Sequence, residues 1–427
     1  MKVAVDVEKL KIGMYVCELD RPWRDTSFLF QGFVIRSPQE IEQLRRLCRT
    51  VYVLKGEAAR NIAIQRDREG RTSYSAVTPP PHYRSLKVVQ EVFKINNRPG
   101  DAPRYQDRTT MAEEVALVRN VFAEARLLVQ EIMYDAKLGR SLNLSGAKQA
   151  VRNMADSVLR NPDALMCFAY LQRKDEYTAL HGLRVSVLAL TFGRHLGLPR
   201  EQLEALGIGA LLHDVGMVRV PDEILKKTTE LTPKEHALVQ HHVAWGLEVL
   251  SNSAHIPRAA LEVVANHHER YDGSGYPRGL RGEQIGDFGM IGAIVDHYDA
   301  VTTDRDYRNA VSPHTVLLDM YGWRDTLFRA EFVEKFIQCL GVYPMGSVVQ
   351  LNTGEIGVVS AINRSQRLKP HVMLVYRADG TPYPEMPITN IASYRTDDDR
   401  ACEVERVLEP AVAGIDPMQF LRRAIAA

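Results

Sequence analysis

The sequence has few cysteines, almost no net charge and no long apolar run. Its five cysteines are an odd number with no Cys-x-x-Cys spacing, which argues against a disulfide framework or a zinc knuckle and predicts a reducing, cytoplasmic setting. The 54 Lys and Arg against 53 Asp and Glu leave a formal charge of +1, so no global field draws the chain to DNA, RNA or an anionic membrane. Because no run of about 18 apolar residues and no signal pattern is present, we expect no membrane contact.

What the sequence does contain is a changing pattern along 427 residues, which are too many for one compact core. Residues 1–65 alternate short apolar runs with one capped helical stretch, and they predict a small α+β domain. Residues 66–108 are rich in Pro, Gly, Ser and mixed charge, which is typical of a linker. Residues 109–340 repeat apolar positions three and four apart and predict an all-α bundle core. Residues 341–427 alternate as strands before a last short helix, which predicts a small β module.

Histidine is concentrated in the predicted helical core. Nine of the 13 His lie between His181 and His268, on successive predicted helices. His213 and Asp214 directly follow the apolar run IGALL, and Asp296 lies inside the apolar stretch MIGAIVDHY. Burying an unpaired carboxylate costs free energy that a bound cation removes, so these residues predict a metal site inside the bundle. For any single histidine, a satisfied structural role is the alternative.

Three motifs carry a specific resemblance: HDVG at 213–216, HHERYDGSGYPRGL at 267–280 and DHYDAVTTDRDYR at 296–308. Together they are similar to the HD-GYP family, a subset of the HD metal-dependent phosphohydrolases, over about residues 175–340. The N-terminal part also resembles a domain of unassigned function that precedes HD-GYP domains in some members. The resemblance implies an all-α HD-type domain whose metal centre hydrolyses the bacterial second messenger cyclic di-GMP. We expect pGpG as the product, with GMP as the alternative end product.

The family also implies a set of metal ligands and two divalent ions, Fe or Mn first, with Ni and Zn as alternatives. The matching positions are, for the first ion, His181, His213, Asp214 and Asp296 and, for the second, His242, His267 and His268, with Asp214 bridging both. A hydroxide shared by two ions can attack phosphorus in line, which makes His213 and Asp214 the candidate catalytic residues. Some members carry an additional ligand, a Glu, where Tyr177 stands here. A phenol is a poor ligand at neutral pH, so we expect two ions and not three.

Candidate substrate contacts come from the same motifs. The GYP loop contains Gly275, Tyr276 and Pro277. Its glycines permit close approach of a ligand or partner protein, and Tyr276 offers a stacking face, with a tight surface turn as the alternative. Asp299, Arg305 and Arg308 match family positions near the dinucleotide, where Arg can donate in pairs to phosphate or guanine and Asp can accept from guanine. For these three residues, a salt bridge on the helix surface is the alternative.

One residue departs from the family pattern. Most members read HDxGK, and here Met217 takes the place of the Lys. Losing a cation near the scissile phosphate costs about 2–4 kcal/mol of transition-state stabilisation, so we expect a slow phosphodiesterase. A cyclic di-GMP sensor that signals through its flanking domains without appreciable turnover is the first alternative, and a hydrolase of another nucleotide is the second. The N-terminal domain is a candidate contact for a partner protein, and the oligomeric state stays open.

Overall fold

The computed structural model describes most of the chain in separate stretches. The described residues are 2–11, 14–20, 33–35, 38–54, 105–171, 177–227, 229, 231–251, 256–303, 310–364, 366–395, 400–408 and 410–426. They belong to two compact units, one of Met1–Val92 with Glu230–Ala237 and one of Phe93–Thr229 with Leu238–Ala427. Each unit is described by itself. The predicted linker, residues 66–108, lies outside the described residues except for its last four.

The first unit contains a four-stranded antiparallel sheet and one helix. Its elements are β1 (Lys2–Asp6), η1 (Val7–Lys9), β2 (Tyr15–Leu19), β3 (Phe33–Val34), α1 (Pro38–Leu47) and β4 (Thr50–Leu54). The strand order is β1-β4-β2-β3, and every described pair is antiparallel. Val16, Ile35, Leu44 and Val51 are fully buried between the sheet and the helix, so apolar side chains hold these elements together.

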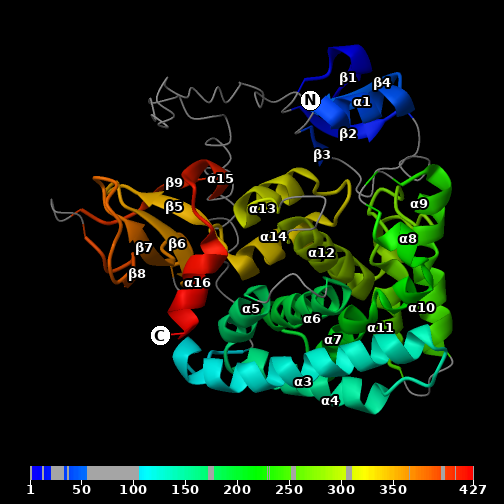
Figure 1. Ribbon diagram of the computed structural model, residues 1–427, viewed down its shortest axis with the longest axis horizontal. Coiled ribbons are helices and arrows are strands. Elements are labelled where there is room, and N and C mark those ends of the chain that lie inside the picture. Colours follow the sequence, from blue (N-terminus) through cyan, green and yellow to red (C-terminus); the bar gives the residue numbers. More distant parts are fainter. Residues whose placement is uncertain are drawn as a thin grey trace. The chain divides into compact units, whose positions relative to one another are not determined.

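Helices make up the middle of the chain. They are α3 (Met111–Lys137), α4 (Leu144–Arg160), α5 (Pro162–Tyr170), α6 (Tyr177–His195), α7 (Arg200–Leu212), η4 (Val215–Arg219), α8 (Asp222–Leu225), α9 (Pro233–Gln240), α10 (His242–Ser251), α11 (Arg258–Asn266), η5 (Gly282–Ile285), α12 (Asp287–Thr302), α13 (Pro313–Gly322) and α14 (Ala330–Leu340). The predicted all-α core is confirmed. Figure 1 shows the long α3 and α4 running side by side along one side of this core.

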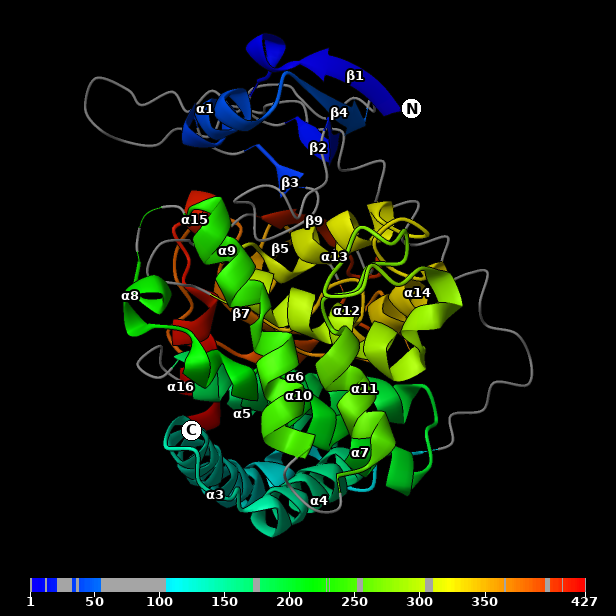
Figure 2. The same cartoon turned by 90° about the vertical axis from the view of Figure 1, so that its right-hand side faces the viewer.

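The centre of the bundle consists of α6, α7, α11 and α12, which pack against one another. Residues 205–212 of α7 and 289–301 of α12 are buried and mostly apolar, so these two helices pass through the core (Figure 2). Capping residues determine where some of the surrounding helices begin. Thr110 and Glu113 form a capping box at the start of α3, in which each side chain bonds the other's backbone N–H. Within the described ranges, no helix combines the length and apolarity needed to cross a bilayer.

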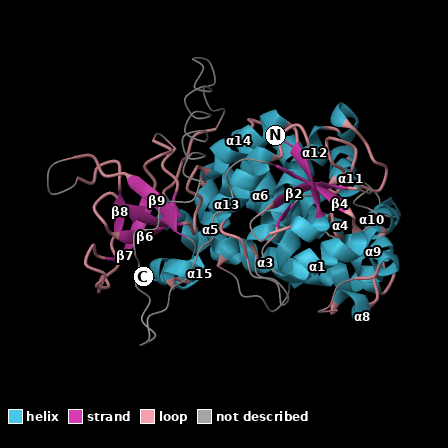
Figure 3. Cartoon of the chain, turned by 90° about the horizontal axis from the view of Figure 1, so that it is seen from above, coloured by secondary structure: helices cyan, strands magenta, loops and turns pink. Residues whose placement is uncertain are grey.

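A five-stranded antiparallel sheet follows the bundle, which confirms the predicted β module. Its strands are β5 (Val348–Leu351), β6 (Ile356–Ala361), β7 (His371–Tyr376), β8 (Ile388–Asn390) and β9 (Val404–Leu408), in the order β8-β7-β6-β5-β9. Two short helices close the chain, α15 (Pro410–Ala413) and α16 (Pro417–Ala426). The sheet lies at one end of the helical core (Figure 3).

The sheet is attached to the bundle by apolar packing and by ion pairs. Val348 and Val375 of the sheet share one buried cluster with Cys167 of α5. Arg364, after β6, donates two hydrogen bonds to Asp163 of α5, at 2.6 and 2.9 Å. Because Asp163 is almost completely buried, this bidentate pair is shielded from solvent and strengthens the junction.

Candidate metal centre

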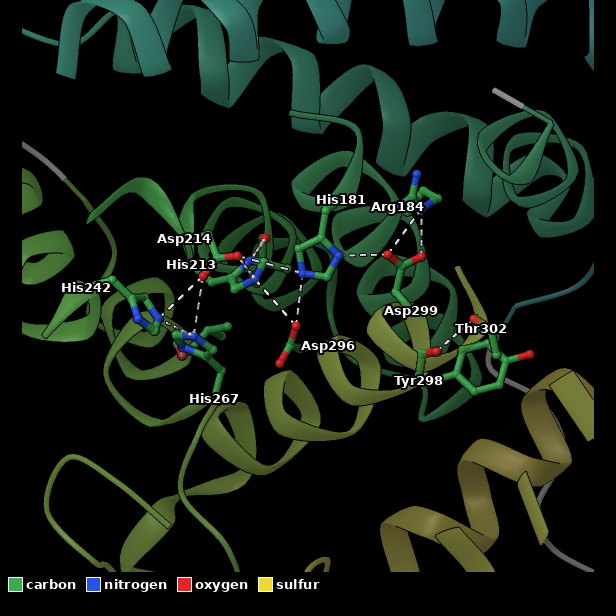
Figure 4. A network of polar contacts seen from close by, with 12 residues as sticks. His181, Arg184, His213, Asp214, His242, His267, Asp296, Tyr298, Asp299 and Thr302 are labelled. Atoms are coloured by element: carbon green, nitrogen blue, oxygen red, sulfur yellow. Dashed lines mark hydrogen bonds and ion pairs between the residues drawn. The ribbon is translucent and has the colours of Figure 1, made fainter. Parts of the chain in front are cut away.

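Most of the residues predicted to bind metal lie at helix ends, and all of them lie in the middle of the bundle. α6 carries His181, His213 and Asp214 follow α7, His242 opens α10, His267 and His268 follow α11, and α12 carries Asp296. Five separate helices thus bring these side chains together (Figure 4). His213 and His267 are the C-caps of their helices, where the negative end of the helix dipole favours a cation.

Backbone carbonyls orient three of the imidazoles. The distances from Nδ1 to a carbonyl oxygen are 2.7 Å for His213 to Ala210, 2.6 Å for His242 to Val239 and 2.9 Å for His267 to Val264. A carbonyl only accepts, so each Nδ1 carries the proton and donates it. Each Nε2 is therefore left with its lone pair, turned toward the other ligands. This is the arrangement that a metal-binding histidine needs.

The side chains form two groups that meet at Asp214. Their members are His181, His213 and Asp296 in one and Asp214, His242, His267 and His268 in the other, with the ligand atoms of each group within 4.8 Å of one another. Asp214 Oδ2 lies 3.3 Å from His213 Nε2, while Asp214 Oδ1 lies 3.4 Å from His242 Nε2. One carboxylate thus presents an oxygen to each group, as a ligand shared between two ions does.

The spacing and the donor types fit divalent ions. Metal–nitrogen and metal–oxygen bonds of about 2.1 Å place neighbouring ligand atoms about 3.0–3.4 Å apart. His181 Nε2 and Asp296 Oδ1 are 3.0 Å apart, and the Nε2 atoms of His242 and His267 are 3.3 Å apart. The buried Nε2 of His213 has no hydrogen-bond partner among the described residues, so a cation would satisfy it. Imidazole and carboxylate donors without thiolate suit Fe, Mn, Ni or Zn.

Burial keeps the imidazoles of the second group neutral. Burial first, and then the neighbouring His213 and His242, hold the pKa of His267 down at about 3. Burial also lowers the pKa of His242, although Asp214 opposes the change. The carboxylates behave differently, since burial raises the pKa of Asp296 but the neighbouring His181 and His213 outweigh it and hold the pKa well below its usual range. Neutral imidazoles and ionised carboxylates are the forms that bind metal.

Asp299 lies in a different place from the one we expected. We expected a contact with the dinucleotide, but its side chain is completely buried behind His181. Asp299 Oδ2 accepts a hydrogen bond from His181 Nδ1 at 2.7 Å, and Oδ1 accepts one from Arg184 Nε at 2.8 Å (Figure 4). With no exposed surface and both oxygens engaged, Asp299 orients the imidazole of His181, a candidate metal ligand, instead of meeting substrate.

The GYP loop packs directly on His268, one of the candidate metal ligands. The Tyr276 ring stacks on His268, with 4.5 Å between ring centroids and 25° between planes. Burial raises the pKa of Tyr276 well above its usual range, so the phenol keeps its proton. A Cβ on Gly275 would lie 2.5 Å from the His268 carbonyl oxygen, so only glycine permits this approach. Pro277, next to Tyr276, is exposed.

Sequence reasoning missed Glu269, which shapes this loop. Its carboxylate is buried and accepts hydrogen bonds from the backbone N–H groups of Arg278, at 2.8 Å, and Leu280, at 2.9 Å. The sequence feature that could have identified Glu269 is its position directly after His267 and His268. A carboxylate buried beside candidate metal ligands needs hydrogen-bond donors of its own.

Other predicted positions give less structural information. Arg305 and Arg308 lie outside the described residues. Tyr177 is the first residue of α6. Met217 lies in η4, three residues after Asp214, and is partly buried.

The fold and the site define a class, the helical HD domain with paired His and Asp clusters. Comparison with known families agrees: residues 165–328 match the HD domain, residues 2–147 match a domain of unknown function (DUF3391), and residues 348–396 match a KOW domain associated with HD domains. HD phosphohydrolases use divalent metals, and the two side-chain clusters can bind such ions.

Similarity to named proteins identifies the family within this class of HD domains. The chain is 30% identical to the cyclic di-GMP phosphodiesterase PA4108 of Pseudomonas aeruginosa over 414 residues, which are 96% of this chain and 92% of that protein. A cyclic di-GMP phosphodiesterase of Thermotoga maritima is 34% identical over 39% of this chain and 45% of its own length. A 3'3'-cGAMP-specific phosphodiesterase of Vibrio cholerae is 30% identical over 50% of this chain and 40% of its own length. The chain belongs to the HD-GYP family.

Proposed function

We propose that this protein is a metal-dependent phosphodiesterase that hydrolyses cyclic di-GMP to pGpG, with GMP as the alternative end product. The observation that carries the proposal is Asp214, whose two oxygens each face a different group of imidazoles. A carboxylate in that position can hold two ions at the short separation used for phosphate-ester hydrolysis. The relative from Pseudomonas aeruginosa, which is similar along nearly the whole chain, is named for the same substrate.

The proposed roles follow from the two groups. His181, His213 and Asp296 would hold one ion and His242, His267 and His268 the other, with Asp214 shared. Bound ions would neutralise the phosphate oxygens and lower the pKa of a water molecule that attacks phosphorus. The imidazoles are buried or nearly so, whereas the Asp214 side chain is 20% exposed. A phosphate would therefore approach from the side of Asp214.

Two ions, Fe or Mn, are our proposed cofactors. Both metals accept the imidazole and carboxylate donors that are present, and neither group contains a thiolate. Tyr276 would contribute a proton-bearing phenol beside His268, within reach of a ligand or a partner protein at the loop.

Met217 supports a slow enzyme. A thioether cannot stabilise the negative charge that develops on the scissile phosphate. Lys226 does not replace the missing cation in an obvious way, since it is exposed and pairs with Asp222 at 3.4 Å. Met217 also favours the second candidate function, a sensor that binds cyclic di-GMP without appreciable turnover.

The two candidates separate in one experiment. Protein prepared without oxygen and loaded with Fe(II) or Mn(II) is incubated with cyclic di-GMP, and pGpG and GMP are followed by chromatography. Turnover that tracks metal content supports the enzyme, while stoichiometric binding without product supports the sensor. Parallel incubation with 3'3'-cGAMP tests the substrate that the Vibrio cholerae relative is named for. Asp214→Ala is the control, because it removes the shared ligand.

The domain division also stays our proposal: residues 1–65, the linker 66–108, the catalytic domain 109–340 and the C-terminal module 341–427. The match to the domain of unknown function runs to residue 147 and so includes all of α3. Limited proteolysis followed by mass spectrometry tests these boundaries, with the first cuts expected between residues 66 and 108.

A further inference from the structure

Helix α3 has two apolar faces, and only one of them is covered by the helical core. The inner face consists of Val118, Phe122, Ala125, Val129 and Ile132, which are at most 2% exposed. The outer side carries Leu117, Leu127 and Tyr134, exposed by 54, 67 and 60%, and the C-cap Leu138 is 48% exposed. Among the described residues only two other large apolar side chains, Leu225 and Ile388, are classed as exposed. Exposed apolar surface is therefore concentrated on this helix.

The outer side has the seven-residue spacing of a helix pair. Asn120, Leu127 and Tyr134 follow one another at intervals of seven residues. Ala116 and Ala123 are also seven residues apart, and each lies on the same side of the helix four residues before Asn120 or Leu127. A stripe with this period faces a partner helix along its whole length, and small residues let the two backbones approach closely. A polar Asn within such a stripe fixes the register of a two-helix assembly. Over its 27 residues α3 is about 40 Å long, which is enough for nearly four repeats.

Charged residues flank the stripe with opposite signs on its two sides. Arg119 and Arg126 lie along one side, and Glu124 and Glu131 lie along the other. In a parallel pair of identical helices, a residue on the first side meets the partner residue five positions further along. Arg119 then faces Glu124 of the second copy, and Arg126 faces Glu131. In an antiparallel pair, Arg would face Arg and Glu would face Glu, which opposes association.

We propose that the outer stripe of α3, defined as Ala116, Asn120, Ala123, Leu127 and Tyr134, docks a second copy of this chain in a parallel two-helix arrangement. Leu117 and Leu138 add apolar surface along the glutamate side of this stripe. The charge pattern favours an identical partner, because α3 carries both the row of arginines and the row of glutamates that would pair with each other across the two helices. Gln130 makes the seam partly polar, and Lys137 at its end pairs with Asp222 of α8 in the same chain, at 3.1 Å, so we expect the dimer to dissociate in the micromolar range and not the nanomolar range.

The first test changes the most exposed residue of the stripe. Sedimentation velocity of the full chain across micromolar concentrations gives the dimer dissociation constant. Leu127→Glu places two charges in the seam and is expected to raise this constant at least about tenfold. Ile388→Glu is the matched control, since Ile388 is similarly exposed, at 53%, but lies on β8. It should leave association unchanged. A wild-type chain that stays monomeric, or a dimer unaffected by Leu127→Glu, overturns the proposal.

The second test addresses the parallel arrangement. Arg126→Glu alone and Glu131→Arg alone each place like charges opposite one another, so each should weaken the dimer. The double variant Arg126→Glu with Glu131→Arg restores opposite charges and should recover the wild-type dissociation constant. If the double variant is no better than the single variants, the parallel arrangement is wrong. Circular dichroism and metal content, expected to match wild type, show that each variant is folded.

Discussion

Gly216 offers the sharpest test of how the second ion site is built. This glycine follows the His213–Asp214 pair by two residues and lies against the first turn of α10. A Cβ placed on it would be 2.0 Å from the His242 carbonyl oxygen and 2.5 Å from the Gly246 nitrogen. Carbon and oxygen seldom approach closer than about 3.3 Å, so Gly216→Ala forces the start of α10 to move away by about 1.3 Å.

That movement acts on a metal ligand. His242 opens α10, and its Nε2 lies 3.4 Å from Asp214 Oδ1 and 3.3 Å from His267 Nε2. Metal–ligand distances tolerate only about 0.2 Å of error, so a shift several times larger removes His242 from coordination. We expect affinity for the second ion to fall about 10- to 100-fold and bound metal to drop from two ions per chain toward one. Overpacking should also lower the free energy of unfolding by about 1–3 kcal/mol.

Elemental analysis after anaerobic loading measures the ions, chromatography measures cyclic di-GMP turnover, and thermal unfolding measures stability. Gly246→Ala is a control from the same contact, because a Cβ there has no neighbour closer than 3.5 Å. It should keep both ions and gain about 0.5–1 kcal/mol, since alanine favours helix over glycine. If folded Gly216→Ala protein holds two ions and turns over at the wild-type rate, the packing of α10 does not set the site.

Three further substitutions probe the centre. Asp214→Ala removes the carboxylate shared by the two groups, so bound metal should fall and turnover should disappear while the circular dichroism spectrum is retained. Met217→Lys restores a cation near the scissile phosphate and should raise the rate about tenfold or more, and an unchanged rate counts against the assigned role of Met217. Asp299→Asn leaves Arg184 buried without its counter-charge, at a cost of about 3 kcal/mol in stability, and loosens His181. Metal affinity should then fall about tenfold, whereas a role in substrate binding alone would raise KM with metal content unchanged.

The sequence predicted the helical core because apolar spacing of three and four residues persists through it. Residues that can bind metal break this apolar spacing at identifiable positions, such as His213 and Asp214 after a buried apolar run. Most of the candidate ligands lie at a helix end, where the chain reverses direction inside the core. The positions at which polar residues break the apolar spacing therefore predicted that these side chains would come together. Family motifs then supplied the pairing of particular residues into two groups.

Tertiary packing decided what the sequence left open. Asp299 lies one turn after Asp296 and therefore on the same side of α12, which is compatible with either substrate or structure. Only the packing of α6 against α12 places His181 Nδ1 at its carboxylate. In the same way β9, which we did not predict, reads VERVL without strict alternation, and its pairing with β5 depends on a distant part of the chain.

A cation is what makes this cluster of buried imidazoles energetically consistent. His213, His242 and His267 donate from Nδ1 to backbone carbonyls, so each turns a lone pair toward the others. Two such lone pairs 3.3 Å apart, as in His242 and His267, repel each other in a low dielectric, and burial opposes their protonation. An ion removes the repulsion and satisfies both nitrogens. Metal binding at this cluster would therefore be thermodynamically coupled to the packing of α7, α10 and α11.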